Sequence, residues 1–172
     1  MISNTIDKRP KEADNRTAMG HLEADTVIGK RSGECLVTLV DRKTRLAWIE
    51  RSPSKSADAV NEAILRVMER IPGGFVKTIT PDRGKEFANH SQITKCKAIE
   101  FYFPPPHSPW ARGTNENFNG LLREFVPKAH DISAFSDEQL HNFEFLLNTR
   151  PRKCLGWKSP LELFLGILLH LT

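Results

Sequence analysis

The stretch Leu22-Glu-Ala-Asp-Thr-Val-Ile28 alternates residue by residue between two faces. One face carries Leu22, Ala24, Thr26 and Ile28, and the other carries Glu23, Asp25 and Val27. A period of two residues is the pattern of a β-strand with two distinct faces. An acid inside such a strand, flanked by apolar residues, is less easily explained as a surface residue. Asp25 is therefore a candidate functional residue.

The segments that follow this strand alternate between strand and helix patterns. Composition and period predict further strands at 34–40, 45–50, 75–80 and 98–103. They predict helices at 56–71, through 87–93, at 114–125, and after the capping residues Ser136 and Ser159. The order is three strands, helix, strand, helix, strand and three helices. It predicts an α/β domain with a mixed five-stranded sheet flanked by helices.

The totals describe one ordinary domain with an excess of positive charge. The chain has 172 residues, of which 39% are hydrophobic and 27% charged, and its net charge is +4. The basic residues gather in two places, near the N-terminus (Lys8, Arg9 and Lys11) and near the C-terminus (Arg150, Arg152, Lys153 and Lys158). This placement makes a polyanion a candidate partner.

The ends of the chain and its cysteines bear on location. Residues 1–19 are polar and without period, which predicts a linker or N-terminal arm before a core at 20–172. The three cysteines are isolated, which argues against disulfides or zinc and for a reducing, cytoplasmic compartment. No secretory signal precedes the core, and the apolar run 161–171 is shorter than the ~20 residues of a membrane span. No membrane partner is predicted.

Two further acids stand in polar, glycine-containing segments. Asp82 lies in Thr80-Pro-Asp-Arg-Gly-Lys-Glu-Phe87, and Glu116 lies in Arg112-Gly-Thr-Asn-Glu-Asn-Phe-Asn-Gly-Leu-Leu-Arg123. Taken alone, Asp82 is first a turn former and Glu116 a helix surface acid. Together with Asp25, they give three carboxylates on rigid elements that can meet at one sheet edge. Hard oxygen ligands of this kind suit Mg2+, and two ions ~4 Å apart can assist displacement at a phosphodiester.

One face of the predicted helix 114–125 is polar. Glu116, Asn119, Gly120 and Arg123 recur there at helical spacing, opposite an apolar stripe. A glycine inside a helix costs about 1 kcal/mol relative to alanine. Its presence suggests that something approaches the helix closely at Gly120.

Six motifs carry a resemblance to a known family. They are Gly20-His-Leu-Glu-Ala-Asp-Thr26, Leu36-Val-Thr-Leu-Val-Asp-Arg-Lys-Thr44, Asp82-Arg-Gly-Lys-Glu-Phe87, Pro106-His-Ser-Pro-Trp-Ala-Arg-Gly-Thr-Asn-Glu-Asn117, Asn119-Gly-Leu-Leu-Arg123 and Arg150-Pro-Arg-Lys-Cys-Leu-Gly156. From about Gly20 to Phe164 the chain resembles the catalytic core of DDE transposases and retroviral-type integrases. It is most similar to the IS-thirty family of bacterial insertion sequences.

The resemblance implies a fold, a site and an activity. The fold is RNase H-like, and Asp25, Asp82 and Glu116 are the catalytic DDE residues and metal ligands. The cofactor is Mg2+, with Mn2+ as a substitute and two ions in the site. The activity is DNA transposition and integration: water frees a 3′-hydroxyl at the element's end, and that hydroxyl then attacks target DNA.

The resemblance also implies partners. These are DNA, as transposon ends and target duplex, and further copies of the chain in a homodimer or higher synaptic assembly. The location is the bacterial cytoplasm, at the nucleoid. The candidate DNA contacts, which combine phosphate-binding cations, amides and one stacking aromatic ring, are Lys85, His107, Trp110, Arg112, Asn115, Asn119 and Arg123.

Three departures from the family pattern keep alternatives open. The family usually has Trp at the position of Leu22, and an acid or Gln more often than Ala at 111. Family members carry a helix-turn-helix domain upstream, which this chain lacks, so a fragment or truncated gene product with weak recognition of transposon ends is expected. The alternatives are a non-transposing remnant that binds DNA weakly, a stand-alone RNase H-like nuclease, and a basic α/β interaction domain.

Overall fold

The computed structural model describes residues 4–30, 33–106, 108 and 113–169. The strands are β1 (His21–Ile28), β2 (Cys35–Asp41), β3 (Ala47–Ser52), β4 (Thr78–Thr80) and β5 (Glu100–Phe101). The α-helices are α1 (Lys11–Asp14), α2 (Ala57–Glu69), α3 (His90–Lys97), α4 (Gly113–Leu122), α5 (Asp137–Thr149) and α6 (Pro160–Leu168). Short 3-10 helices lie at Ile6–Lys8, Lys85–Phe87, Ile132–Ala134 and Lys153–Leu155.

The strands form one mixed sheet in the order β3-β2-β1-β4-β5. β1, β2 and β3 are antiparallel neighbours, whereas β1 pairs in parallel with β4, and β4 with β5. The predicted α/β class with a mixed five-stranded sheet is confirmed. Because β1 is central, Leu22 and Glu23 pair with β2 on one side and with β4 on the other.

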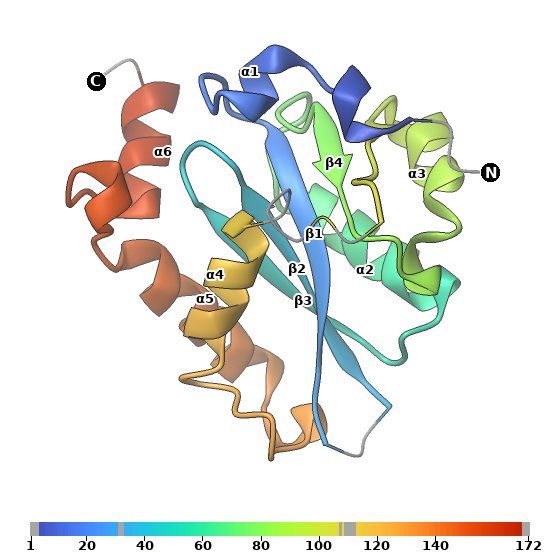
Figure 1. The fold of residues 1–172 in the computed structure, drawn as a ribbon. Helices are drawn as coiled ribbons and strands as arrows, with labels where there is room; N and C mark the ends of the chain where they lie inside the picture. The colour runs from blue at the N-terminus through green and yellow to red at the C-terminus, as the bar shows by residue number, and fades with distance from the viewer. Residues whose placement is uncertain (1–3, 31–32, 107, 109–112, 170–172) are drawn as a thin grey trace.

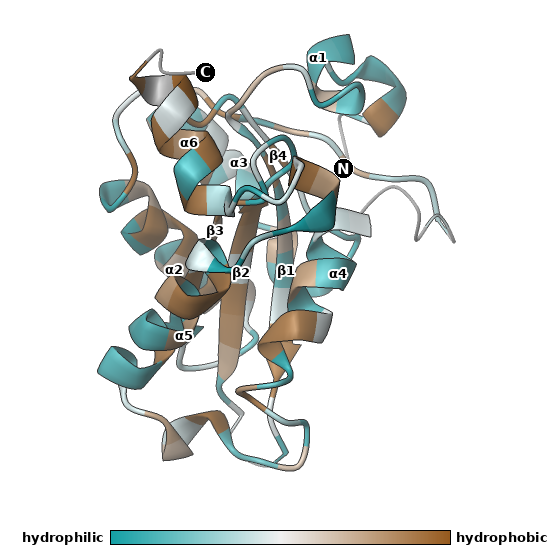
Figure 2. Ribbon diagram, turned by 90° about the vertical axis from the view of Figure 1, so that its left-hand side faces the viewer, coloured by the Kyte–Doolittle hydropathy of each residue, from teal (hydrophilic) through white to brown (hydrophobic). Residues whose placement is uncertain are grey.

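Helices cover both faces of the sheet (Figure 1). On one face, α2 and α3 pack on a core that includes Leu22, Ala24 and Ile64. On the other face, α4 and α5 pack on a core that includes Val27 and Phe118. The two-faced pattern of 22–28 is confirmed by this division, and Figure 2 shows β2, hydrophobic along most of its length, between the helical layers.

Most predicted elements exist, and their ends differ for local reasons. β3 begins at Ala47 rather than residue 45 because Arg45 has a left-handed backbone with φ of 63°. β5 is shorter than 98–103 because Ala98 caps α3 in the same conformation. The predicted capping boxes at Ser136 and Ser159 are both present. None of the described helices combines the length and the apolarity needed to cross a membrane.

The segment before β1 differs most from expectation. Residues 1–19 were predicted as a linker or N-terminal arm, and the described part of this segment, residues 4–19, folds against the core. Ala13 is fully buried. Arg9 is 6% exposed and donates a hydrogen bond to Thr80 Oγ1 at a distance of 3.0 Å. Thr5 forms a parallel bridge with Phe103. The sequence suggested a linker because this segment is charged and has no apolar period. Specific polar contacts hold it to the core, and such contacts leave no periodic pattern in the sequence.

Candidate active site

Asp25 and Asp82 lie on neighbouring parallel strands. β1 and β4 pair with a constant offset of 57 residues, from His21 opposite Thr78 to Glu23 opposite Thr80. The same offset separates Asp25 from Asp82, which follows the end of β4 by two residues. The register therefore brings these two acids to the same edge of the sheet.

The carboxylate of Asp25 is oriented by its neighbours. Its Oδ1 accepts a hydrogen bond from the backbone N–H of Thr26 at 2.9 Å, and its Oδ2 accepts one from Asn119 Nδ2 at 3.0 Å. The amide of Asn119 is fixed in turn because its Oδ1 accepts from Thr38 Oγ1 at 3.2 Å. A side chain on α4 thereby holds an acid on β1.

A tight turn brings Asp82 close to a third carboxylate. Asp82 Oδ1 accepts from the backbone N–H of Gly84 at 2.7 Å. A Cβ at Gly84 would overlap the carboxylate of Glu86 and lie 2.7 Å from Asp82 Oδ1. The φ of Gly84 is negative (−60°) and suits any residue, so the constraint here is space: a side chain would have to move these carboxylates.

Lys55 faces this group of acids. Its Nζ forms an ion pair with Glu86 Oε1 at 2.8 Å, and Thr26 Oγ1 donates to the same oxygen at 3.0 Å. The hydrogen bond with Glu86 raises the pKa of Lys55, and the charges of Asp82 and Asp25 add to the effect. Burial would raise the pKa of Glu86, but Lys55 and two further hydrogen bonds outweigh it and lower that pKa. Sequence patterns gave no signal for Lys55, which lies in a polar loop.

Glu116 lies on α4 rather than at the strand edge that carries these acids. It lies in the first turn of α4 and is exposed, lining an open hollow with Gly113, Asn117, Gly120 and Leu121. Among the described residues, no three or more acids, histidines or cysteines lie close enough to hold a metal ion. The structure brings together Asp25 and Asp82 of the predicted triad, and it places Glu116 one helical turn before Asn119, the partner of Asp25.

The N-terminal end of α4 is anchored by a buried acid. Glu23 is fully buried, and its Oε2 accepts from the backbone N–H of Asn115 at 2.8 Å. Its Oε1 pairs with Arg42, which also donates from Nε to Ala13 O at 2.8 Å. One ion pair therefore ties together β1, the β2–β3 turn, the N-terminal segment and α4.

Of the predicted DNA contacts, the structure leaves Lys85 exposed and contradicts Asn115. The side chain of Asn115 has no exposed area, so it cannot reach DNA, and its Nδ2 finds no acceptor within the described residues. Asn119 is occupied by Asp25 and Thr38, which makes it a positioning residue here.

The remaining predicted contacts are one structural clamp and three undescribed residues. Arg123 donates to Ile28 O at 2.9 Å and to Val126 O at 3.3 Å, and burial lowers its pKa. It therefore joins the end of β1 to the turn after α4 instead of extending freely toward solvent. His107, Trp110 and Arg112 lie outside the described residues.

Gly120 on the exposed side of α4 has space around it. A Cβ added there would meet no atom within 4 Å. Substituting Gly120 with Ala is expected to stabilise the protein by about 1 kcal/mol, because alanine is the better helix former. Calorimetry should record a rise in Tm of about 2–4 °C. Gly156→Ala is the matched control: its φ of 63° disfavours any side chain, so its Tm should fall. A lower Tm for Gly120→Ala would contradict this account of α4.

Sequence relatives are transposases. No family model matches the chain. Over 163 residues it is 40% identical to the transposase for insertion sequence element IS4351 of Bacteroides fragilis, covering 95% of this chain and 50% of the relative. Over 158 residues it is 40% identical to transposase InsI for insertion sequence element IS30A of Escherichia coli, covering 92% and 41%. The chain spans about half the length of the curated relatives it matches.

The fold has a solved counterpart. The catalytic core domain of BIV integrase superposes with a TM-score of 0.67 at 18% identity, covering 88% of this chain and 97% of that one. This likeness confirms the predicted RNase H-like class, and the sequence identities confirm the predicted resemblance to insertion-sequence transposases. Over nearly all of its length, the chain is similar in sequence to insertion-sequence transposases, and it has the fold of an integrase catalytic core.

Proposed function

We propose that this chain is the catalytic core of a transposase that cuts and joins DNA strands. The observation that carries the proposal is the placement of Asp25 and Asp82 at adjoining parallel strands, in a chain 40% identical to transposases. Asp25, Asp82 and Glu116 are the proposed catalytic acids. Of these, Glu116 lies on the helix whose Asn119 holds Asp25.

Asp25 and Asp82, at one edge of the sheet, offer the kind of oxygen ligand that suits Mg2+, or Mn2+ in its place. Carboxylate oxygens are hard ligands, and Mg2+ keeps several waters, so few protein ligands are needed. When bound, a pair of such ions stabilises the attacking and leaving oxygens of an in-line displacement. The chain itself contributes orientation, because Asn119 and Thr26 N–H fix Asp25, and Gly84 N–H fixes Asp82.

The proposed reaction has two displacements at phosphorus. In the first, water loses a proton and forms a new P–O bond, the P–O3′ bond breaks, and the leaving 3′ oxygen takes up a proton to become a free 3′-hydroxyl. In the second, that hydroxyl loses its proton and attacks a target phosphodiester, whose own 3′ oxygen leaves and is protonated. Each step exchanges one P–O bond for another, and no covalent enzyme intermediate is needed.

The proposed partners are the element's ends, the target duplex and further copies of this chain. A mobile element has two ends, and each active site processes one strand at a time. At least a homodimer, or a higher synaptic assembly, is therefore proposed.

The test is a cleavage and strand-joining assay on short DNA duplexes with Mn2+, run beside a chelator control. Cut and joined products that require Mn2+ are the expected result. Cut products without any joined products would overturn this proposal and indicate a stand-alone nuclease. The absence of both products, with Mn2+ binding intact, would overturn activity of this chain by itself.

Gly84→Ala tests whether the turn geometry matters to this activity. The new methyl group would displace the Glu86 and Asp82 carboxylates. Since misplacing groups around metal ligands typically costs 10–100-fold, we expect product formation to fall by about that factor. Gly73→Ala is a fitting control because a Cβ there meets nothing within 4 Å. Unchanged rates for Gly84→Ala would show that the position of Asp82 is not limiting.

A further inference from the structure

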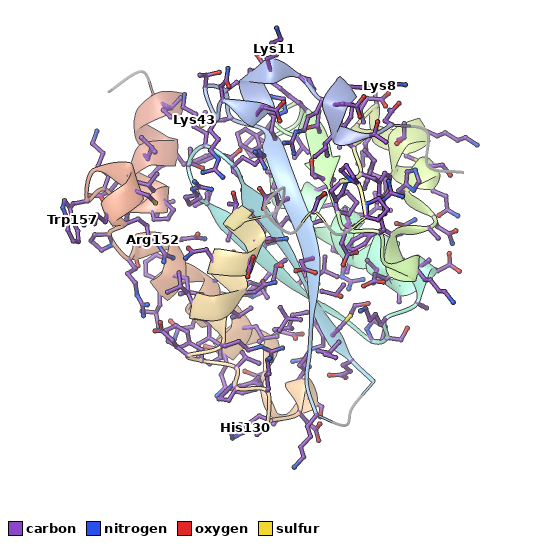
Figure 3. All side chains as sticks on the ribbon, viewed as in Figure 1. Lys8, Lys11, Lys43, His130, Arg152 and Trp157 are labelled. Carbon is purple, nitrogen blue, oxygen red and sulfur yellow. The ribbon has the colours of Figure 1, made fainter. Side chains whose placement is uncertain are left out.

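A cavity of about 310 Å3 lies beside α4, outside the acidic edge of the sheet. Its floor is apolar, with Val40, Phe118 and Leu121. Around it stand three arginines from distant parts of the chain: Arg16 after α1, Arg45 before β3 and Arg152 before the last 3-10 helix. Figure 3 shows Arg152 beside the ribbon of α4. Ligand sites in proteins are concave and largely apolar, with a few convergent polar groups.

Two of the arginines converge on one side chain, while Arg152 donates from Nη2 to Leu147 O at 3.0 Å. Arg45 Nη1 donates to Thr114 Oγ1, and Arg16 Nη2 lies 3.5 Å from the same oxygen. Arg16 and Arg45 both have left-handed backbones, with φ of 57° and 63°. Such conformations are uncommon for residues with side chains. These two backbone conformations direct the guanidinium groups of Arg16 and Arg45 toward the hydroxyl of Thr114, at the start of α4.

No acid neutralises this cluster. Within the described residues, none of the three guanidinium groups forms an ion pair, and Arg152 Nε is buried without a hydrogen-bond partner. Of the acidic groups that act on Arg45 and Arg152, Glu23 and Glu124 are already paired with Arg42 and Arg150, and the third is the thiol of Cys154, which also lines the pocket. Burial lowers the pKa of Arg45, and repulsion from Arg16 lowers it further. A bound anion would relieve both penalties.

We propose that this arginine pocket, defined by Arg16, Arg45, Arg152 and Thr114, binds a phosphate group of a DNA backbone. Planar guanidinium groups match phosphate geometry with paired hydrogen bonds. The positive end of the α4 dipole, which starts at Gly113, adds to the attraction.

DNA is the favoured source of the phosphate because of where the pocket lies. It shares Gly113, Asn117 and Leu121 with the hollow that exposes Glu116. A strand passing Glu116 therefore continues directly over the arginine pocket. This inference rests on the proposed function for the identity of the ligand, but its phosphate chemistry stands on the arginines alone.

The test measures binding of the full chain to a labelled DNA duplex by fluorescence anisotropy, in chelator and at several salt concentrations. Arg45→Gln and Arg152→Gln should each weaken binding about tenfold, the effect of one charge-assisted hydrogen bond. The loss of affinity should be the same for all DNA sequences. The slope of log affinity against log salt concentration should become shallower by about 1. Lys95→Gln removes the same charge from exposed α3, on the other face of the sheet, and should change little.

Further arms separate the sources of the anion and guard against misfolding. Pyrophosphate should raise the Tm of the wild type more than that of Arg152→Gln, at equal ionic strength. If Arg45→Gln fails to fold, Arg152→Gln and Arg16→Gln carry the test. Equal affinities of wild type and arginine variants, or an equal loss in Lys95→Gln, would overturn the pocket. If poly-glutamate at matched charge displaces DNA from the arginine pocket, the phosphate proposal would give way to an acidic protein partner.

Because these measurements omit metal, they are independent of the cleavage assay. Cleavage with unaffected binding in the arginine variants would refute the pocket and leave the proposed function in place. Arginine-dependent binding of duplex or pyrophosphate without any cleavage would refute the function and leave the pocket in place.

Discussion

Replacing Asp82 with asparagine is expected to lower Mn2+-dependent cleavage and joining by more than about 100-fold, beyond the range seen when groups around a metal ligand are changed. Asparagine keeps the size of the side chain and the acceptor for the N–H of Gly84, which lies 2.7 Å from Asp82 Oδ1. It removes the charge that would hold a cation beside Asp25. The fold should persist while the chemistry is lost.

A second readout of this variant measures metal binding without DNA. Acids gathered at one edge repel one another, and a divalent ion offsets that repulsion. Mn2+ should therefore raise the Tm of the wild type and leave that of Asp82→Asn unchanged. Asp58→Asn, an exposed acid in the first turn of α2, is the control and should respond like the wild type. An equal rise in Asp82→Asn would remove Asp82 from the metal site.

Glu23→Gln is expected to cause the largest loss of stability. Breaking a buried ion pair typically costs 3–5 kcal/mol, because the remaining charge stays buried without its partner. Arg42 would be that charge, since it is 6% exposed and Glu23 is fully buried. For a chain of this size, thermal denaturation should show a Tm lower by about 10 °C.

The surface pair Arg150–Glu124 provides the comparison. Both side chains are at least 38% exposed, so Glu124→Gln should cost no more than about 1 kcal/mol. In the double variant Glu23→Gln with Arg42→Met, the loss should be smaller than the sum of the two single losses. Strict additivity would mean that the pair is not coupled, contrary to the structure.

The strands and helices were predictable where periodicity was strong. The alternation of Leu22–Ile28 identified β1 and both of its faces, and the capping patterns at Ser136 and Ser159 located the starts of α5 and α6. Element ends were less predictable, because single residues such as Arg45 and Ala98 adopt left-handed conformations that composition does not reveal. The N-terminal segment was missed because it is held by long-range polar contacts, such as that of Arg9 with Thr80.

At the candidate site, sequence patterns indicated where the candidate acids lie in the fold but not what surrounds them. Asp25 and Asp82 could be placed at one edge because they sit in or directly after strands. The pairing of Lys55 with Glu86 joins residues 31 positions apart, one in a loop and one in a 3-10 helix, and no local pattern signals it. Asn115 and Asn119 have the polarity of DNA contacts, yet tertiary packing turns their side chains toward Thr38 and Asp25 in the sheet. Polarity alone does not distinguish a buried brace from an exposed ligand.

The bridge between Thr5 and Phe103 also limits association between copies of the protein. Ile6 N–H donates to Phe103 O and Phe103 N–H donates to Asn4 O, each over 3.0 Å, so residues 4–6 cap backbone groups directly after β5. An uncovered sheet edge is a template for another chain to pair with. A protein shortened to begin at Gly20 would present that edge to its neighbours, and it would tend to aggregate through strand-to-strand association even with every acid of the site intact.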